Sequence, residues 1–177
     1  MGKTKTKKNK ETVRCEVNRL GASILETEEF QRAYDEIHHK ATSVASHSMD
    51  VACTGVRICR ILNKFNVKVN REDMVKSALC HDLGMLERND RYATTKECHR
   101  LHPEESAKLA EVLISDYNEN IDDAIRNHMW PMAGSRPKSR EGKVITVADK
   151  YCAFKDVRHI VRTYGINIIS FIMLRGM

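Results

Sequence analysis

A histidine and an aspartate, His81 and Asp82, stand side by side where an apolar helical run ends. Burying either group without a partner would cost several kcal/mol of free energy, so a folded core has no use for the pair unless something holds it. A divalent metal ion can bind the imidazole and the carboxylate together. We therefore expect His81 and Asp82 to carry the catalytic chemistry of a metal site.

Three more histidines and one more aspartate complete the set of candidate metal ligands. The full set is His47, His81, Asp82, His102, His128 and Asp149. Any one of these histidines alone would more often be a hydrogen-bonded core residue than a ligand, so the prediction depends on the six occurring together. Imidazole and carboxylate suit Fe, Mn, Zn or Ni better than Ca or Mg. Six protein ligands are too few to saturate two octahedral ions. Open positions would therefore remain for water and substrate, as catalysis requires.

Helices must position these residues, because helix-favouring residue types are abundant and aromatic residues make up only 6% of the chain. His47 shares a helical stripe with Val51 and Ile58 in a predicted helix over residues 42–65. Asp50, one turn after His47, could orient that histidine or face solvent. The next predicted helix begins after an Asn70 cap and brings His81 and Asp82 to its inward side.

Residues 86–101 are polar and non-periodic, which predicts a loop at the rim of the site, where basic side chains and His99 could meet an anionic substrate. Pro103 fits the first position of a helix, so we expect His102 at the mouth of a helix that continues to about residue 115. Asn120 is the predicted cap of the following helix, which carries His128 on its apolar stripe.

A long helix is predicted over residues 141–164. Asp149 lies in its apolar middle and would need a metal or a cation if buried. The neighbouring Lys150 would have to turn inward to supply that cation, which adjacent helical positions disfavour. The predicted core face of this helix consists of Val144, Val147, Tyr151, Phe154 and Val161. A last apolar helix over residues 166–174 could be core or a subunit contact in a homodimer.

The bulk composition limits the remaining possibilities. A chain of 177 residues suits one domain, expected over residues 13–177. Five lysines in residues 1–10 supply most of the net charge of +6, so residues 1–12 read as a disordered basic tail and the folded body is not basic. No cysteine belongs to a C-x-x-C pair, no signal peptide is apparent, and residues 166–174 are too short to cross a bilayer. We expect a cytoplasmic protein.

The order of the candidate ligands resembles that of the HD-domain metal-dependent phosphohydrolase superfamily, and in particular its binuclear subset with the pattern H…HD…H…H…D. The resemblance covers roughly residues 40–160. Segments at His81-Asp82-Leu83-Gly84 and His102-Pro103 also echo phosphodiesterases of the HD-GYP type. The resemblance to the HD-domain superfamily implies an all-α HD-domain helical bundle, here of about six or seven helices. Such a protein would hydrolyse a phosphate ester or anhydride with a metal-activated hydroxide.

The resemblance also implies roles for the ligands. His47, His81, Asp82 and Asp149 would hold a first metal ion, and Asp82 would bridge to a second one. His102 and His128 would hold that second ion. The implied cofactors are two divalent transition metal ions, Fe or Mn in the first place, with Zn, Ni, Co or Mg as alternatives.

The substrate is less defined by the sequence. The chain has Met85 and Met129 where the HD-GYP pattern has lysine and histidine, and it lacks the GYP signature. A smaller phosphate ester, a nucleotide or a dinucleoside polyphosphate therefore fits as well as a cyclic dinucleotide. Basic residues near the ligand helices are candidate substrate contacts: Arg57, Lys150 and Arg158.

Three other functions are compatible with the sequence. A few members of the superfamily are di-iron oxygenases, and the ligand set alone does not separate them from hydrolases. A non-catalytic sensor module could use the metal only to hold its fold together. The lysine-rich tail could bind nucleic acid weakly through phosphate contacts, in which case removing residues 1–10 would abolish that binding.

Overall fold

The computed structural model describes residues 12–36 and 42–156. Within these two ranges the chain forms helices joined by turns and contains no β-sheet, which confirms the predicted all-α fold class. The basic tail, the pair His38 and His39, Arg158 and the apolar segment 166–174 lie outside the described residues. No helix of the described part is long and apolar enough to span a membrane.

The N-terminal part of the chain is broken into short helices. Residues 12–20 are helical, and α2 (Ala22–Leu25) and α3 (Glu28–Arg32) follow. The Thr27 hydroxyl accepts a hydrogen bond from the backbone nitrogen of Phe30, which starts α3. Ile24 and Phe30 are fully buried. The helical structure is therefore interrupted at Thr27, because a threonine cap begins a new helix there.

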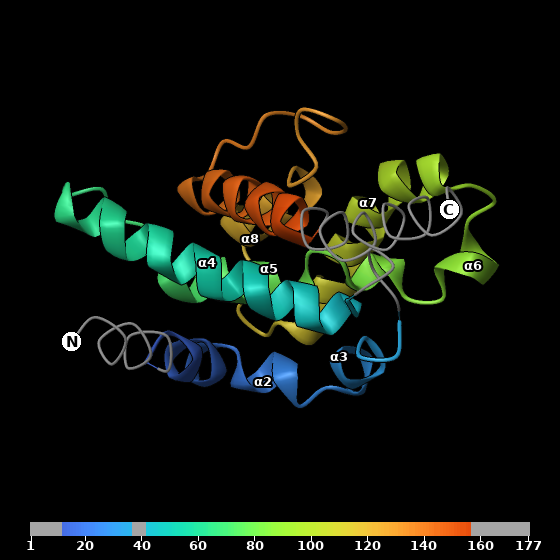
Figure 1. Ribbon diagram of the computed structural model, residues 1–177, viewed down its shortest axis with the longest axis horizontal. Helices are drawn as coiled ribbons and strands as arrows, with labels where there is room; N and C mark the ends of the chain where they lie inside the picture. Colours follow the sequence, from blue (N-terminus) through green and yellow to red (C-terminus); the bar gives the residue numbers. More distant parts are fainter. Residues whose placement is uncertain (1–11, 37–41, 157–177) are drawn as a thin grey trace, which may run out of the picture.

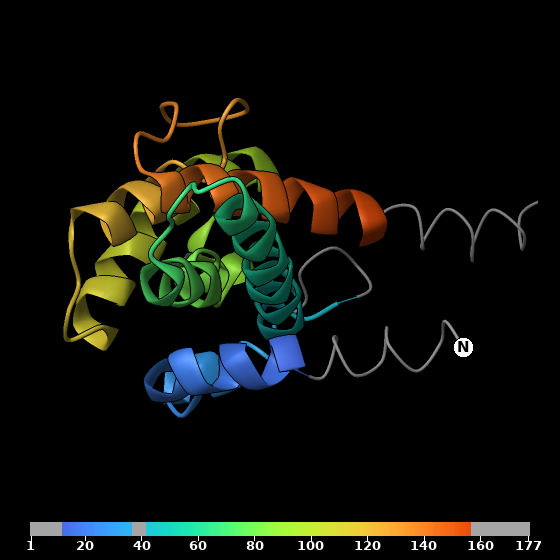
Figure 2. The ribbon, with the colours of Figure 1, turned by 90° about the vertical axis from the view of Figure 1, so that its left-hand side faces the viewer.

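The central helix is α4 (Val44–Lys64), which packs on α5 (Arg71–Cys80). Ser43 caps α4 and Asn70 caps α5 through side-chain oxygens, as Asn70 was predicted to do. Figure 1 shows α4 crossing the molecule between the N-terminal helices and the helical residues 140–156, and Figure 2 shows the same order from the side. The first half of α4, which carries His47, is thus enclosed by other helices.

The largest correction to the sequence prediction concerns residues 86–113. The expected loop contains α6 (Arg88–Arg91), and α7 spans Thr95–Leu113, so Pro103 lies inside a helix and His102 is buried in its middle. The Thr94 hydroxyl accepts from the backbone nitrogen of Glu97 at 3.1 Å, and the Glu97 carboxylate accepts from the backbone nitrogen of Ala93 at 2.9 Å. These two bonds begin the helix two turns earlier than the proline suggests.

The C-terminal half of the described chain adds α8 (Glu119–Arg126), a turn-rich stretch and helical residues 140–156. Asn118 rather than Asn120 caps α8, because its side-chain oxygen accepts from the backbone nitrogens of Asn120 and Ile121. All six cysteines of the chain are free.

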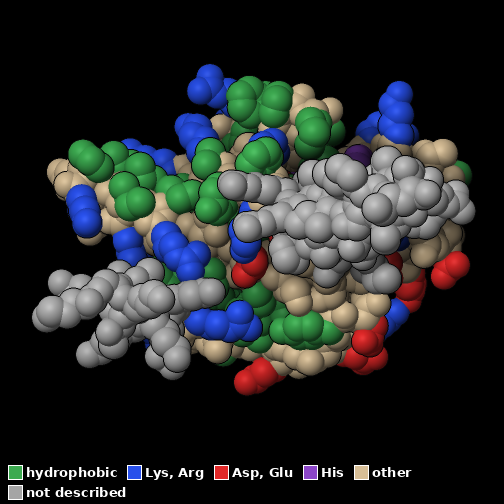
Figure 3. Space-filling model, in the orientation of Figure 1, with side chains coloured by type: hydrophobic (Ala, Val, Ile, Leu, Met, Phe, Trp, Pro, Cys, Tyr) green, Lys and Arg blue, Asp and Glu red, His purple; other side chains and the backbone are tan. Residues whose placement is uncertain are grey.

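The core face of helix 140–156 is not the predicted one. Only Val144 of the predicted described set is buried, whereas Val147, Tyr151 and Phe154 are 58%, 58% and 66% exposed. The helix turns the face of Asp149 inward, and the residues that pack beside it are Ile145, Ala148 and Cys152. Hydrophobic side chains accordingly gather on the surface over this helix and over the far end of α4 (Figure 3). A helix at the surface of a domain buries one face, and in this helix the buried face is the one that carries Asp149.

Candidate metal centre

The structure brings all six candidate ligands together in the interior. Three helices supply His47, His102 and Asp149, and the turns after α5 and α8 supply the others. The exposed fractions are His47 1%, His81 0%, Asp82 3%, His102 1%, His128 1% and Asp149 8%. Two groups each have their ligand atoms within 4.8 Å of one another. We call them the first cluster (His47, His81 and Asp82) and the second cluster (Asp82, His102 and His128).

The Asp82 carboxylate joins the two clusters, one oxygen to each. Oδ2 lies 3.2 Å from Nε2 of His81 and 3.9 Å from Nε2 of His47. Oδ1 lies 3.2 Å from Nε2 of His102 and 3.5 Å from Nε2 of His128. This is the arrangement a carboxylate needs in order to bridge two cations.

Asp149 belongs on the side of the first cluster. Its Oδ1 lies 3.1 Å from Nε2 of His47 and 4.0 Å from Nε2 of His81. With Asp149 beside it, the first cluster has two imidazole nitrogens and two carboxylate oxygens available, whereas the second has two imidazole nitrogens and one carboxylate oxygen.

The tautomers of three histidines are fixed by the backbone. Nδ1 of His81, His102 and His128 lies 2.8, 2.9 and 2.7 Å from a carbonyl oxygen one turn earlier in the chain. A carbonyl oxygen can only accept, so each Nδ1 carries the proton and donates it. In the neutral imidazole the Nε2 lone pair is then directed into the centre, as in metal-binding histidines whose other nitrogen is held by an acceptor.

Two of these Nε2 atoms face each other. Nε2 of His102 lies 3.1 Å from Nε2 of His128. With both Nδ1 atoms protonated, two lone pairs would meet at this distance unless a cation or a proton lay between or beside them. The donor set and its orientation therefore fit a bound divalent transition metal.

His47 is oriented by a carboxylate that sequence reasoning missed. Its Nδ1 lies 3.6 Å from Oδ2 of Asp156, at the end of the described chain. Asp50, the residue considered for this role, is exposed and accepts a hydrogen bond from Lys155 at 3.1 Å. Asp156 follows Asp149 by seven residues, two turns along one helical face, and that spacing is the signal that could have identified it.

His47 and Asp149 form an ion pair in the centre. Burial acts to lower the pKa of His47, but hydrogen bonds to Asp149 and Asp156 and the charge of Asp82 outweigh it and raise that pKa to about 10. Burial acts to raise the pKa of Asp149, but the hydrogen bond from His47 and the charge of His81 hold it well below its usual range. A proton and a metal ion would thus compete for Nε2 of His47.

The pKa values of His81 and His128 are shifted in opposite directions. Burial opposes protonation of His81, but the charge and hydrogen bond of Asp82 raise its pKa. The pKa of His128 is lowered by burial and by the charges of His81 and His102, against the effect of Asp82. His128 is therefore held neutral, the form in which imidazole binds a metal.

The turn that carries His81 and Asp82 is pressed against α7. Gly84 lies in the 3-10 turn η1 (Leu83–Met85), where its backbone nitrogen donates to Oγ of Ser106 at 2.8 Å and its carbonyl accepts from the Tyr92 hydroxyl at 2.8 Å. A Cβ atom at Gly84 would stand 2.4 Å from the carbonyl oxygen of His102. Glycine is required at this close approach, which holds the turn that carries His81 and Asp82 against the helix that carries His102.

The two predicted substrate contacts within the described residues lie at different distances from the centre. Lys150 turns inward, contrary to expectation, and its Nζ donates to the carbonyl oxygen of His128 at 3.0 Å and lies 3.7 Å from Oδ2 of Asp149. Arg57 is exposed ten residues after His47 on α4, roughly 15 Å along the helix axis, and is not brought to the centre. Arg158 lies beyond the described residues.

A comparison with known families gives a match over most of this architecture. The family model of the HD domain matches residues 44–153, which is more than half of the chain and includes all six candidate ligands. Neither the curated proteins nor the solved structures give a match. With the paired His81 and Asp82 at the junction of the two clusters, the chain belongs to the HD domain family.

Proposed function

We propose that this protein is a metal-dependent phosphohydrolase that cleaves a phosphate ester or anhydride of a nucleotide-like substrate at a binuclear centre. The observation that carries the proposal is the pair of facing Nε2 atoms of His102 and His128, 3.1 Å apart, beside an Asp82 carboxylate that offers one oxygen to each cluster. Membership of the HD domain family supports metal-dependent hydrolysis as the reaction.

The residues divide into two sets of ligands in this proposal. His47, His81 and Asp149 would hold one ion, His102 and His128 the other, and Asp82 both. When bound, two such ions neutralise phosphate oxygens and lower the pKa of water so that it can attack phosphorus. The backbone acceptors hold the Nδ1 protons of His81, His102 and His128, so none of these three has to change tautomer.

The proposal is tested by metal content and turnover of the same preparation. Protein purified without chelator or metal-binding tag should contain about two Fe or Mn ions per chain and release phosphate from a panel of phosphate esters, with equal rates in air and under nitrogen. Oxygen consumption that requires iron would instead indicate an oxygenase. Metal that raises the melting temperature without turnover of any ester would indicate a structural or sensor module. Either result contradicts the proposal.

Substitution of Asp156 should weaken metal binding without removing a ligand. In Asp156→Asn the carboxylate that faces Nδ1 of His47 is lost, so that ring is less firmly oriented and less basic. We expect metal affinity to fall about 10- to 100-fold, measured by competition with a chromophoric chelator. The matched control is Asp50→Asn, the same change at an exposed carboxylate on α4. Equal affinities in the two variants would remove Asp156 from this role.

A further inference from the structure

A cavity of about 680 Å³ opens beside the second cluster. The start of α7 forms one wall, and the turn after α8 forms the other. Its lining consists of Thr94, Thr95, Lys96, Glu97, His99, Arg100, Met129, Met132 and Ala133. The His99 and His102 rings are 6.4 Å apart between centroids, and Met129 directly follows His128. A group held at the second cluster would therefore have this cavity as its neighbour.

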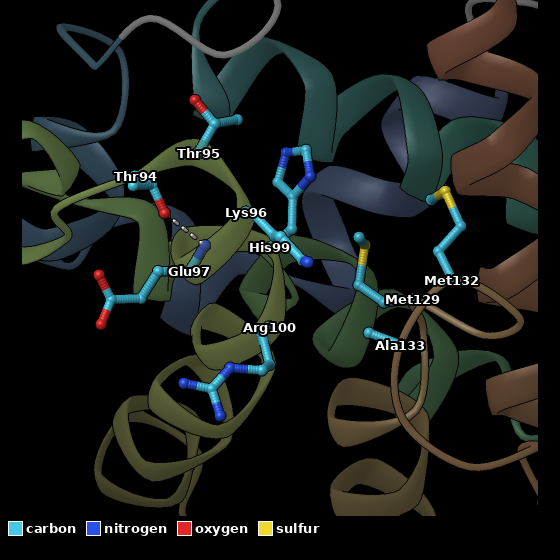
Figure 4. Close-up of a pocket in the computed structure, with 9 residues that line it drawn as sticks. All are labelled: Thr94, Thr95, Lys96, Glu97, His99, Arg100, Met129, Met132 and Ala133. Carbon is cyan, nitrogen blue, oxygen red and sulfur yellow. Dashed lines mark hydrogen bonds between the residues drawn. The ribbon is translucent and has the colours of Figure 1, made fainter.

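The two walls differ in chemistry. In Figure 4 the imidazole of His99 stands opposite the side chains of Met129 and Met132, with open space between them. Thioether sulfur makes favourable contacts with aromatic rings, and the flat imidazole offers a stacking face. Met132 is 70% exposed, so its thioether is accessible to a ligand in the cavity. This arrangement suits a planar ring.

The polar wall has a positive balance. Lys96 and Arg100 are cationic, and the only acidic residue in the lining, Glu97, has its carboxylate bonded to the backbone nitrogen of Ala93. An anionic ligand with a planar apolar part would thus meet both charge and ring partners. Cavities of this size commonly hold ligands as large as a nucleotide.

We propose that this cavity is the base subsite of the enzyme: it binds the planar ring of a nucleotide-like substrate between His99 and the two methionines, while the phosphate lies at the second cluster. The inference rests on the proposed function for the place of the phosphate. It assigns the ring recognition to Met129, Met132 and His99, none of which is a candidate metal ligand.

The fluorescence of a natural tryptophan can be used to test the inference. Trp130 is the only tryptophan, lies between the two methionines in sequence and is 38% exposed. Metal-loaded protein is titrated with adenosine 5′-monophosphate while Trp130 fluorescence is followed, and ribose 5-phosphate is measured by its competition with that nucleotide. The pair differs only in the base, so stacking should make the nucleotide bind about tenfold more tightly.

A matched pair of variants locates the effect. Met132→Ala should reduce the preference for the nucleotide about threefold and leave the affinity for ribose 5-phosphate unchanged. Val112→Ala, which truncates an 81% exposed side chain elsewhere on α7, should change neither affinity. Equal binding of the two phosphates by the wild-type protein would overturn the inference, and so would an unchanged preference in Met132→Ala.

Phosphate release separates failure of the subsite from failure of the proposed function. If p-nitrophenyl phosphate is hydrolysed in a metal-dependent way but the two probes bind equally, the proposed function stands and the base subsite is wrong. If the nucleotide is preferred through Met132 but no phosphate ester is hydrolysed, ring recognition is supported and the hydrolase assignment is overturned.

Discussion

Asp82→Asn should lose both metal ions and reduce hydrolysis by about a thousandfold or more. The Asp82 carboxylate is the one group that lies within 4 Å of Nε2 of all four histidines in the centre. Asparagine keeps the shape but replaces one oxygen with an amide nitrogen, which cannot bind a cation and carries no charge. Loss of several kcal/mol of metal-derived stabilisation corresponds to a rate change of this size.

The measurement combines elemental analysis, circular dichroism and phosphate release. The fold should be retained, because asparagine fills the same space and the helices around it pack through apolar side chains. Asp90→Asn, the same change at an exposed position on α6, serves as the control and should keep both metal and activity. A metal-loaded and active Asp82→Asn protein would contradict the assignment of Asp82 as the bridge.

Metal-free protein should lose stability as the pH rises from about 6.5 towards 10. The pKa of His47 is raised from 6.5 to about 10 in the folded protein, so its proton favours the folded state. This contribution is complete below pH 6.5 and disappears as the pH passes through the folded pKa. Since one pKa unit corresponds to about 1.4 kcal/mol, several kcal/mol are involved, and the raised pKa of His81 acts in the same direction.

Metal binding should show the opposite dependence on pH. A metal ion must displace the proton from Nε2 of His47, so its apparent affinity should rise by up to about tenfold per pH unit over the same interval. Melting temperatures of metal-free and metal-loaded protein, recorded from pH 6 to pH 9, should therefore diverge. His47→Gln should flatten the metal-free curve. Parallel curves for the two wild-type forms would show that the His47 proton and the metal do not compete.

The part of the centre that follows from helical periodicity was predictable. His47 lies on the same stripe as Val51, and both are buried in α4 as expected. His81 and Asp82 were expected at the end of a helix and are found in the turn immediately after α5. In each case the local pattern alone determines which side of the helix is buried, so no knowledge of distant contacts is needed.

The sequence predictions were wrong where two local signals conflict, or where packing against a distant helix determines which residues are buried. Pro103 predicted a helix start, but the hydrogen bonds of the Thr94 and Glu97 side chains begin α7 earlier. The proline therefore lies inside the helix. Helix 140–156 has apolar residues on more than one face, and only the position of the other ligands selects the face of Asp149. Asp156 could not be chosen over Asp50 without knowing how α4 lies against that helix.

The interaction between His47 and Asp149 joins residues 102 positions apart. A metal ion held by both ends of this interval, as proposed, would close a loop that the unfolded chain leaves open, so its binding energy would become available only after the helices have assembled. Occupancy and folding are then a single linked equilibrium. A core substitution far from the centre that leaves the metal-free chain mostly unfolded would appear in an assay as a defect in metal binding. For such a variant, the supply of metal would set how much of the protein survives proteolysis as well as how much of it is active.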